Sequence, residues 1–132
     1  MLYLLDTNIL SDLIRNPQGA VSRRIAVVGE ENICTSIVVA AELRYGAAKK
    51  SSQRLTENIE SILGAIEVLP LEQPSDAAYG QIRAALEAQG QLIGANDLFI
   101  AAQAKSLDAI LVTDNQAEFA RIEGLPIENW LR

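Results

Sequence analysis

The sequence of 132 residues contains no histidine and only one cysteine. Without an imidazole, Ser-His-Asp triads and other histidine-based catalysis are excluded, and so is any metal site built on histidine. The single thiol, Cys34, cannot form an internal disulfide or a thiolate zinc site. It lies in an apolar stretch, so we expect a small buried residue in a protein of the reducing cytoplasm.

Long apolar runs are missing as well, although hydrophobic residues make up 49% of the chain. No stretch approaches the roughly 20 apolar residues that cross a bilayer, and the opening MLYLLDTN carries no basic flank or cleavage site. We therefore expect no membrane contact. The length suits one domain over residues 1–132, with a core large enough to fold without disulfides.

Basic side chains are scarce, with 11 Lys and Arg against 17 Asp and Glu and a formal net charge of −6. Nucleic-acid binders usually carry the opposite balance, which argues against RNA or DNA as a partner. The argument weakens if a divalent cation neutralises several carboxylates in one site. Any catalysis has to use carboxylates, hydroxyls, Lys, Tyr or a bound metal, and oxygen ligands select Mg²⁺ or Mn²⁺.

Short apolar runs alternate with helical patterns along the chain. The runs predict strands at 2–5, 33–36, 66–69 and 110–113. The patterns predict helices at 8–14, 20–28, 37–50, 53–63, 74–89, 96–106 and 116–122. This alternation is typical of an α/β fold with a mostly parallel β-sheet flanked by α-helices on both faces. Ligand sites in such folds lie beyond the carboxyl ends of the strands.

Two predicted strands deliver an acidic residue to that edge of the sheet. Asp6 directly follows the strand 2–5, in the segment DTN, and Asp114 directly follows the strand 110–113, in the segment TDN. The threonine and asparagine in each segment can hydrogen-bond a carboxylate or a water. The two acids are therefore expected side by side.

The helix IVVAAELRYGAA adds a third acidic residue. Helical spacing predicts that Glu42 shares a buried face with Val38, Ala41 and Tyr45, whereas Arg44 points about 200° away at roughly 100° per residue. The acid is thus expected on the buried side of this helix and the base on the solvent side.

A fourth acidic residue, Asp97, stands in the apolar stretch LIGANDLFIA. It is predicted near the start of its helix, on the face of Ile100, Ala101 and Ala104. A lone buried carboxylate costs several kcal/mol unless it is paired, hydrogen-bonded or holding a metal. Asp97 is therefore expected either to contact water at the helix start or to have a function, such as holding a metal.

Each acidic residue also has a purely structural explanation. Asp6 and Asp97 could cap helices, Asp114 could belong to an ordinary turn, and Glu42 could pair with a nearby base. The four together are better explained by one site. Converging carboxylates repel one another, which raises pKa values, and a divalent cation relieves the repulsion. Such sites support metal-assisted phosphoryl transfer.

The order of these segments resembles a known family. Asp6 in DTN, Glu42 in AEL, Asp97 in GANDLFIA and Asp114 in VTDN precede the tail EFARIEGLPIENW. This arrangement, over nearly the whole chain, resembles the PIN-domain ribonucleases and specifically the VapC-type toxins of bacterial toxin–antitoxin pairs. The resemblance implies a PIN-like domain and an endoribonuclease that needs Mg²⁺ or Mn²⁺, leaves a 5′-phosphate and a 3′-hydroxyl, and inhibits translation.

The resemblance also implies residue roles and partners. Four acidic residues would be catalytic and hold the metal, Glu42 directly or through a water: Asp6, Glu42, Asp97 and Asp114. Asn8 and Thr113 would orient these ligands. Relatives with a similar tail cut the anticodon loop of initiator tRNA. Family members form homodimers, meet DNA only through their antitoxin, and are held inactive by that antitoxin, whose tail lies in a groove over the acidic site.

Two other enzyme classes with acids at strand ends do not match the sequence. A receiver domain needs an adjacent acidic pair after the first strand and a lysine after a late one, whereas Asp6 stands alone. A haloacid-dehalogenase-type phosphatase needs a second acid where this chain has Asn8. The non-enzyme alternative is a PIN-like scaffold that binds RNA or a protein without cutting, and measured turnover decides between the two.

Overall fold

The computed structural model describes residues 1–131, and Arg132, the last residue of the predicted domain, lies outside the described residues. One parallel sheet contains all five strands: β1 (Tyr3–Leu5), β2 (Ile33–Ser36), β3 (Glu67–Leu69), β4 (Ile110–Val112) and β5 (Ile127–Glu128). The strand order is β3-β2-β1-β4-β5. The predicted α/β fold is confirmed.

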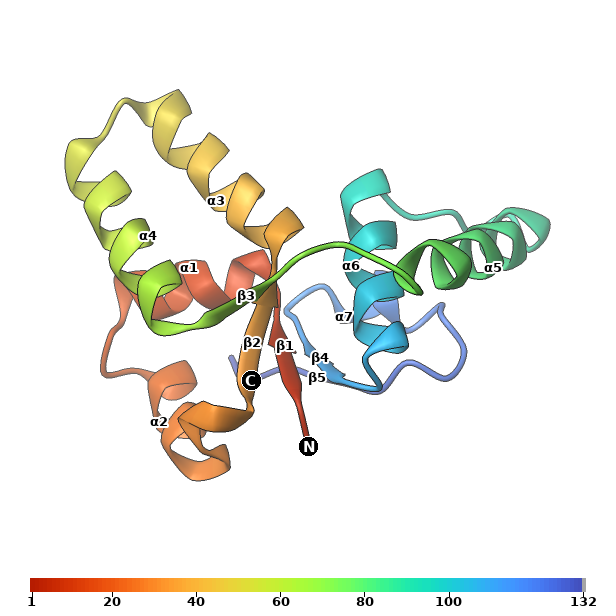
Figure 1. Cartoon of the computed structure of the whole chain (residues 1–132), viewed down its shortest axis with the longest axis horizontal. Coiled ribbons are helices and arrows are strands. Elements are labelled where there is room, and N and C mark those ends of the chain that lie inside the picture. The colour runs from red at the N-terminus through yellow and green to blue at the C-terminus, as the bar shows by residue number, and fades with distance from the viewer. Residues whose placement is uncertain (132) are drawn as a thin grey trace.

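Helices connect the strands and cover the sheet (Figure 1). They are α1 (Thr7–Arg15), α2 (Ala20–Val28), α3 (Ile37–Lys50), α4 (Gln53–Ala65), α5 (Ser75–Ala88), α6 (Ala95–Ser106) and α7 (Gln116–Phe119), with a 3₁₀ turn η1 (Glu30–Asn32). Figure 1 shows α1 to α4 on one side of the strands and α5 and α6 on the other, as predicted for a sheet flanked on both faces. The hairpin of α3 and α4 projects from the body, and the Arg44 guanidinium clamps it by donating to both Glu60 carboxylate oxygens at 2.8 and 2.9 Å.

The patterns in the sequence did not predict β5 and η1. The strand β5 has only two residues, one of which is Glu128, so no apolar run marks it. Backbone bonds pair it with β4, because Leu111 donates to the Pro126 carbonyl at 3.0 Å and Thr113 donates to the Glu128 carbonyl at 2.9 Å. Short strands at a sheet edge therefore depend on pairing that sequence periodicity does not report.

The order of the strands creates a topological switch point between β1 and β4. The chain winds outward from β1 through β2 to β3, then crosses to the other side of β1 and adds β4 and β5. The Asp6 amide donates to the Val112 carbonyl at 2.9 Å, which ties the ends of the two central strands together. Open parallel sheets bind ligands at such a point, outside the carboxyl ends of the strands.

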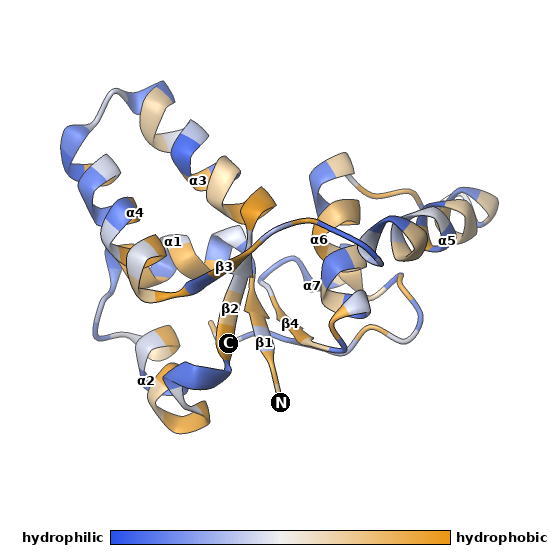
Figure 2. Ribbon diagram, in the orientation of Figure 1, coloured by the Kyte–Doolittle hydropathy of each residue, from blue (hydrophilic) through white to orange (hydrophobic). Residues whose placement is uncertain are grey.

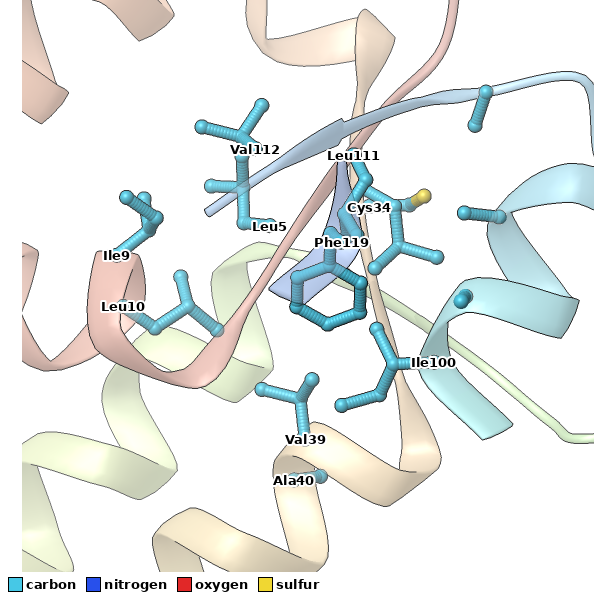
Figure 3. Packing of buried hydrophobic residues seen from close by; sticks show 14 of the residues in the cluster. Leu5, Ile9, Leu10, Cys34, Val39, Ala40, Ile100, Leu111, Val112 and Phe119 are labelled. Carbon is cyan, nitrogen blue, oxygen red and sulfur yellow. The ribbon is translucent and has the colours of Figure 1, made fainter. Parts of the chain in front are cut away.

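The core fills both sides of the central strands. Figure 2 shows the apolar segments gathered at the strands and at the inner parts of α1, α3 and α6. Figure 3 shows the Phe119 ring within the cluster that also contains Leu111, Cys34 and Ile100. Cys34 is fully buried, as predicted, and burial raises the pKa of its thiol to about 12. In residues 1–131, every helix is too short or too polar to cross a membrane.

Candidate functional site

Asp6 lies at the switch point with both carboxylate oxygens held. It is the N-cap of α1, and its Oδ1 accepts from the Thr7 amide at 2.8 Å. Its Oδ2 accepts from the Thr113 hydroxyl at 2.7 Å, across from β4. Only 4% of Asp6 is exposed. The capping explanation for Asp6 is therefore correct, and the cap is also a nearly buried carboxylate at the ligand-binding edge of the sheet.

Glu42 joins this site from α3 through Thr7. The Thr7 hydroxyl donates to Glu42 Oε1 at 2.6 Å, so one residue contacts two of the predicted acids through its amide and its hydroxyl. The Asn96 amide donates to Glu42 Oε2 at 3.4 Å from the first turn of α6. In the described part of the chain, Arg44 pairs with Glu60, and no basic side chain forms a salt bridge with Glu42. The ion-pair explanation for Glu42 is wrong.

The predicted face of α3 is also wrong in part. Glu42 and Val38 are half-buried, but Ala41 is exposed and Tyr45 is 67% exposed. The buried face of α3 consists of Val39, Ala40, Leu43 and Ala47. Since α3 is apolar almost all round, helical spacing alone does not show which face is buried. Arg44 is exposed, as predicted.

Asp97 reaches the site from the first turn of α6. Its Oδ2 accepts from the Asn115 side-chain amide at 3.2 Å. The helix begins at the N-cap Gly94 without a side-chain capping bond, so capping does not explain Asp97. The three residues predicted to share its face are fully buried: Ile100, Ala101 and Ala104. Asp97 is thus anchored by a buried helix face and directed at the switch point.

The remaining predicted residues lie around these three. Thr113 holds Asp6, which suits its predicted orienting role, and Asp114 Oδ1 accepts from the Asn129 side-chain amide at 2.9 Å. Asn8 is exposed in the first turn of α1, where its neighbour Thr7 makes the bond to Glu42. The structure therefore brings Asp6, Glu42 and Asp97 together and places Asp114 at the adjoining end of β4.

Electrostatics identify a carboxylate that sequence reasoning missed. The pKa of Asp97 rises to about 6 because of burial and of repulsion from Asp6, Glu118 and Glu42, in that order, against the lowering bond from Asn115. Glu118 belongs to α7 and follows the N-cap Asn115 by three residues, so both side chains share a helix face. The predicted helix 116–122 includes Glu118, but the structure ends α7 at Phe119, and no pattern in this helix links Glu118 to the other acids.

The pKa of Asp6 is raised as well. Burial raises its pKa, and the bonds from Thr113 and Thr7 offset this only in part, while repulsion from Glu42 adds to it. Two carboxylates with raised pKa values, next to further acids, indicate a site short of positive charge. Carboxylate oxygens are the ligands that Mg²⁺ and Mn²⁺ prefer, so the donor set fits a hard divalent cation. Over residues 1–131, no three acidic side chains already converge on one point.

Asp97 gives the metal-free protein a pH dependence of known sign. Its folded pKa, about 6, exceeds the ordinary value of 3.8, so the folded state binds the proton more tightly between these values. In EDTA, the contribution of Asp97 to the free energy of unfolding should decrease as pH rises through this window, so stability should fall more with pH, or rise less, in wild type than in Asp97→Asn. Chemical denaturation at about pH 4, 5 and 6 measures it. Equal slopes in both proteins would contradict the raised pKa.

Comparisons with known proteins agree with this geometry. The family model of the PIN domain matches residues 3–125. The chain is 41% identical to Ribonuclease VapC2 of Haemophilus influenzae over 131 residues, 98% of each chain. It is 38% identical to the tRNA(fMet)-specific endonuclease VapC of Shigella flexneri over 129 residues, 97% of each. Among solved structures, VapBC2 of Rickettsia felis bound to a promoter DNA fragment is similar, with a TM-score of 0.91, 35% identity, and 98% of this chain and 99% of that chain covered.

Proposed function

The chain belongs to the PIN-domain family, among its VapC-type ribonuclease toxins, and we propose that it hydrolyses phosphodiester bonds of RNA with the help of Mg²⁺ or Mn²⁺. The observation that carries this proposal is the set of repelling carboxylates at the switch point, with the pKa of Asp97 raised to about 6. A scaffold that only binds RNA gains nothing from such repulsion. A phosphoryl-transfer site needs it, because the same charge attracts the cation.

Asp6 and Asp97 are the residues we assign to the cation, joined by Glu42, Asp114 and Glu118. When bound, the cation supplies the positive charge that activates the attacking water and stabilises the phosphate oxygens. The chain's own part is orientation. The Thr113 hydroxyl and the Thr7 amide fix both oxygens of Asp6, and Asn115 fixes one oxygen of Asp97. Thr7 also couples Asp6 to Glu42, so the acids are set as a unit.

The substrate we propose is tRNA, in the anticodon loop of initiator tRNA. A relative 38% identical to this chain is named for tRNA(fMet)-specific cleavage. Loop nucleotides can be splayed out and read, whereas duplex RNA offers mainly its shape. Two cations are available for phosphate beside the acids, because Arg15 and Lys50 line a groove that also contains Thr7 and Glu42.

A cognate antitoxin is the partner that the family assigns to this toxin, and the similar solved structures are complexes of the VapBC type. A net charge of −6 favours a partner with a basic segment, since complementary potentials speed and orient association. We further propose that the toxin forms a homodimer, works in the cytoplasm, consists of one domain over residues 1–132, and meets DNA only through the antitoxin.

The test is cleavage of total tRNA by the purified, antitoxin-free chain. Wild type should give discrete products in Mg²⁺ or Mn²⁺ and none in EDTA, and Asp6→Asn prepared in the same way should give none. Asp76→Asn makes the same chemical change on the exposed start of α5 and should cut like wild type.

Cleavage by Asp6→Asn as well would indicate a contaminating nuclease. Absence of cleavage by wild type, with a cation present and the fold intact, would favour the binding scaffold. Mapping the wild-type products on initiator tRNA then tests the proposed loop separately from the activity.

A further inference from the structure

A groove runs from the acidic site between α3 and α6, which stand on either side of the strand ends (Figure 1). Its volume is about 870 Å³, within the range of about 300 to 1,000 Å³ typical of sites for small molecules. We call it the aromatic groove, and its walls are mainly apolar, with Ile37, Ala41, Tyr45, Leu71, Asn96 and Phe99 among the residues that line it.

One end of the aromatic groove is part of the acidic site. Thr7 and Glu42 line it, and they share the hydrogen bond of 2.6 Å described above. Asn96 lines it too and donates to the second Glu42 oxygen. A molecule in the groove therefore touches the residues that hold the acids, and the groove is continuous with the site where the phosphate has to lie.

The other walls carry two aromatic rings, of which one is packed against a neighbouring ring and the other is exposed. Phe99 is held in place, because Tyr79 stacks on it with centroids 4.5 Å apart and ring planes 17° apart. The Arg83 guanidinium in turn donates to the Tyr79 hydroxyl at 2.9 Å. Tyr45 stands on the opposite helix and is 67% exposed, and Ile37, at the start of α3, is 45% exposed. A fixed ring thus faces the groove from α6, and an uncovered ring from α3.

We propose that the aromatic groove receives an unpaired nucleobase next to the scissile phosphate, with Tyr45 as its stacking platform. This subsite rests on the proposed ribonuclease function. Phosphate contacts dominate affinity in most nucleic-acid binders, but this chain has a net charge of −6 and offers few cations for them, such as Arg15 and Lys50. Stacking of a base on an aromatic side chain needs no positive charge, and it tolerates any base because every base has a π-face. The Asn96 amide at the inner end offers both a donor and an acceptor to a base edge.

The chemistry of the groove favours a base over an apolar protein segment. A nucleobase is flat, with apolar faces and a polar edge, and it is covalently joined to a phosphate. The groove offers a surface for each of these parts: the exposed ring of Tyr45 for the apolar face, Asn96 for the polar edge, and the acidic site for the phosphate. Single-stranded loops can present a base in this manner, whereas stacked duplex bases cannot.

The test compares Tyr45→Ala and Tyr45→Phe with wild type on a fluorescein-labelled oligoribonucleotide of the initiator anticodon loop. A second oligonucleotide lacks the base beside the mapped cleavage site. Tyr45→Ala should raise KM by about 5- to 150-fold with kcat nearly unchanged, whereas Tyr45→Phe should resemble wild type. Removal of the base should raise the KM of wild type and of Tyr45→Phe, but not the KM of Tyr45→Ala. Val27→Ala removes an apolar group that is 77% exposed on α2 and serves as the control.

Wild-type kinetics in Tyr45→Ala, or an equal abasic penalty in all variants, would overturn the subsite. A variant that keeps its RNA kinetics but loses antitoxin binding or self-association would assign the groove to a protein instead. If wild type cuts no RNA, the ribonuclease proposal fails separately, and fluorescence anisotropy of the uncut oligonucleotide decides the subsite. Weaker binding by Tyr45→Ala then supports it, whereas equal binding or none by wild type overturns it.

Discussion

Asp97→Asn is expected to lower the rate of RNA cleavage by more than about 100-fold while the protein remains folded. Residues that only orient metal ligands already contribute about 10- to 100-fold, and Asp97 is assigned to the cation itself. The substitution keeps the size of the side chain and its place at the start of α6, whose buried face is formed by other residues. It also removes the repulsion from Asp6, so the metal-free fold should not lose stability.

Cation binding gives a readout that does not depend on cleavage. Mn²⁺ should raise the melting temperature of wild type, because it binds the folded state, and it should not do so for the double variant Asp6→Asn/Asp97→Asn. Asp76→Asn should keep both the cleavage and the shift. Wild-type cleavage by Asp97→Asn would remove this residue from the mechanism, and equal Mn²⁺ shifts in all proteins would mean that the cation binds elsewhere.

The largest effect on stability is expected for Phe119→Ala. The Phe119 side chain is fully buried in the cluster of Figure 3 and is the largest such side chain in the described structure. Truncating a core Phe to Ala costs about 3 to 5 kcal/mol, through lost burial and the cavity that remains. A domain of this size is typically stable by about 5 to 15 kcal/mol, so the variant should lie near the limit of folding.

Urea denaturation of the metal-free protein measures this loss. Phe119→Leu should cost less than Phe119→Ala, because it keeps most of the apolar volume. Val27→Ala should stay within about 0.5 kcal/mol of wild type, because Val27 is largely exposed. A change of less than about 1 kcal/mol in Phe119→Ala would show that the region around α7 repacks.

Much of the fold followed from the sequence because the central elements are long or strongly apolar. The four predicted strands occur within one residue of their predicted ends, and α2 and α3 begin and end where predicted. Asp6 could be placed because it follows β1 directly, and Asp114 because it lies two residues after the end of β4. Asp97 could be placed because a carboxylate at the start of an apolar helix requires an explanation, and its helix face proved to be buried.

Other features depend on contacts that no local pattern records. The neighbours of Glu42 on α3 were mispredicted because an apolar residue on that helix can face either the core or the groove. Thr7 and Asn115 gained their roles from tertiary contacts with Glu42 and Asp97. Glu118 had no signal of its own, since α7 is a single turn placed by the buried Phe119.

The crossover from β3 to β4 also sets the point during synthesis at which the acidic site is complete. Asp6 and Glu42 leave the ribosome early, but Asp97, Thr113 and Glu118 come from the last part of the chain. A chain that ends before Asp97 therefore lacks one of the two acids that we assign to the cation, and it lacks β4 as a partner strand of β1. We therefore expect no RNA cleavage by a nascent chain, and active toxin only after Glu118, near the end of the sequence, has left the ribosome.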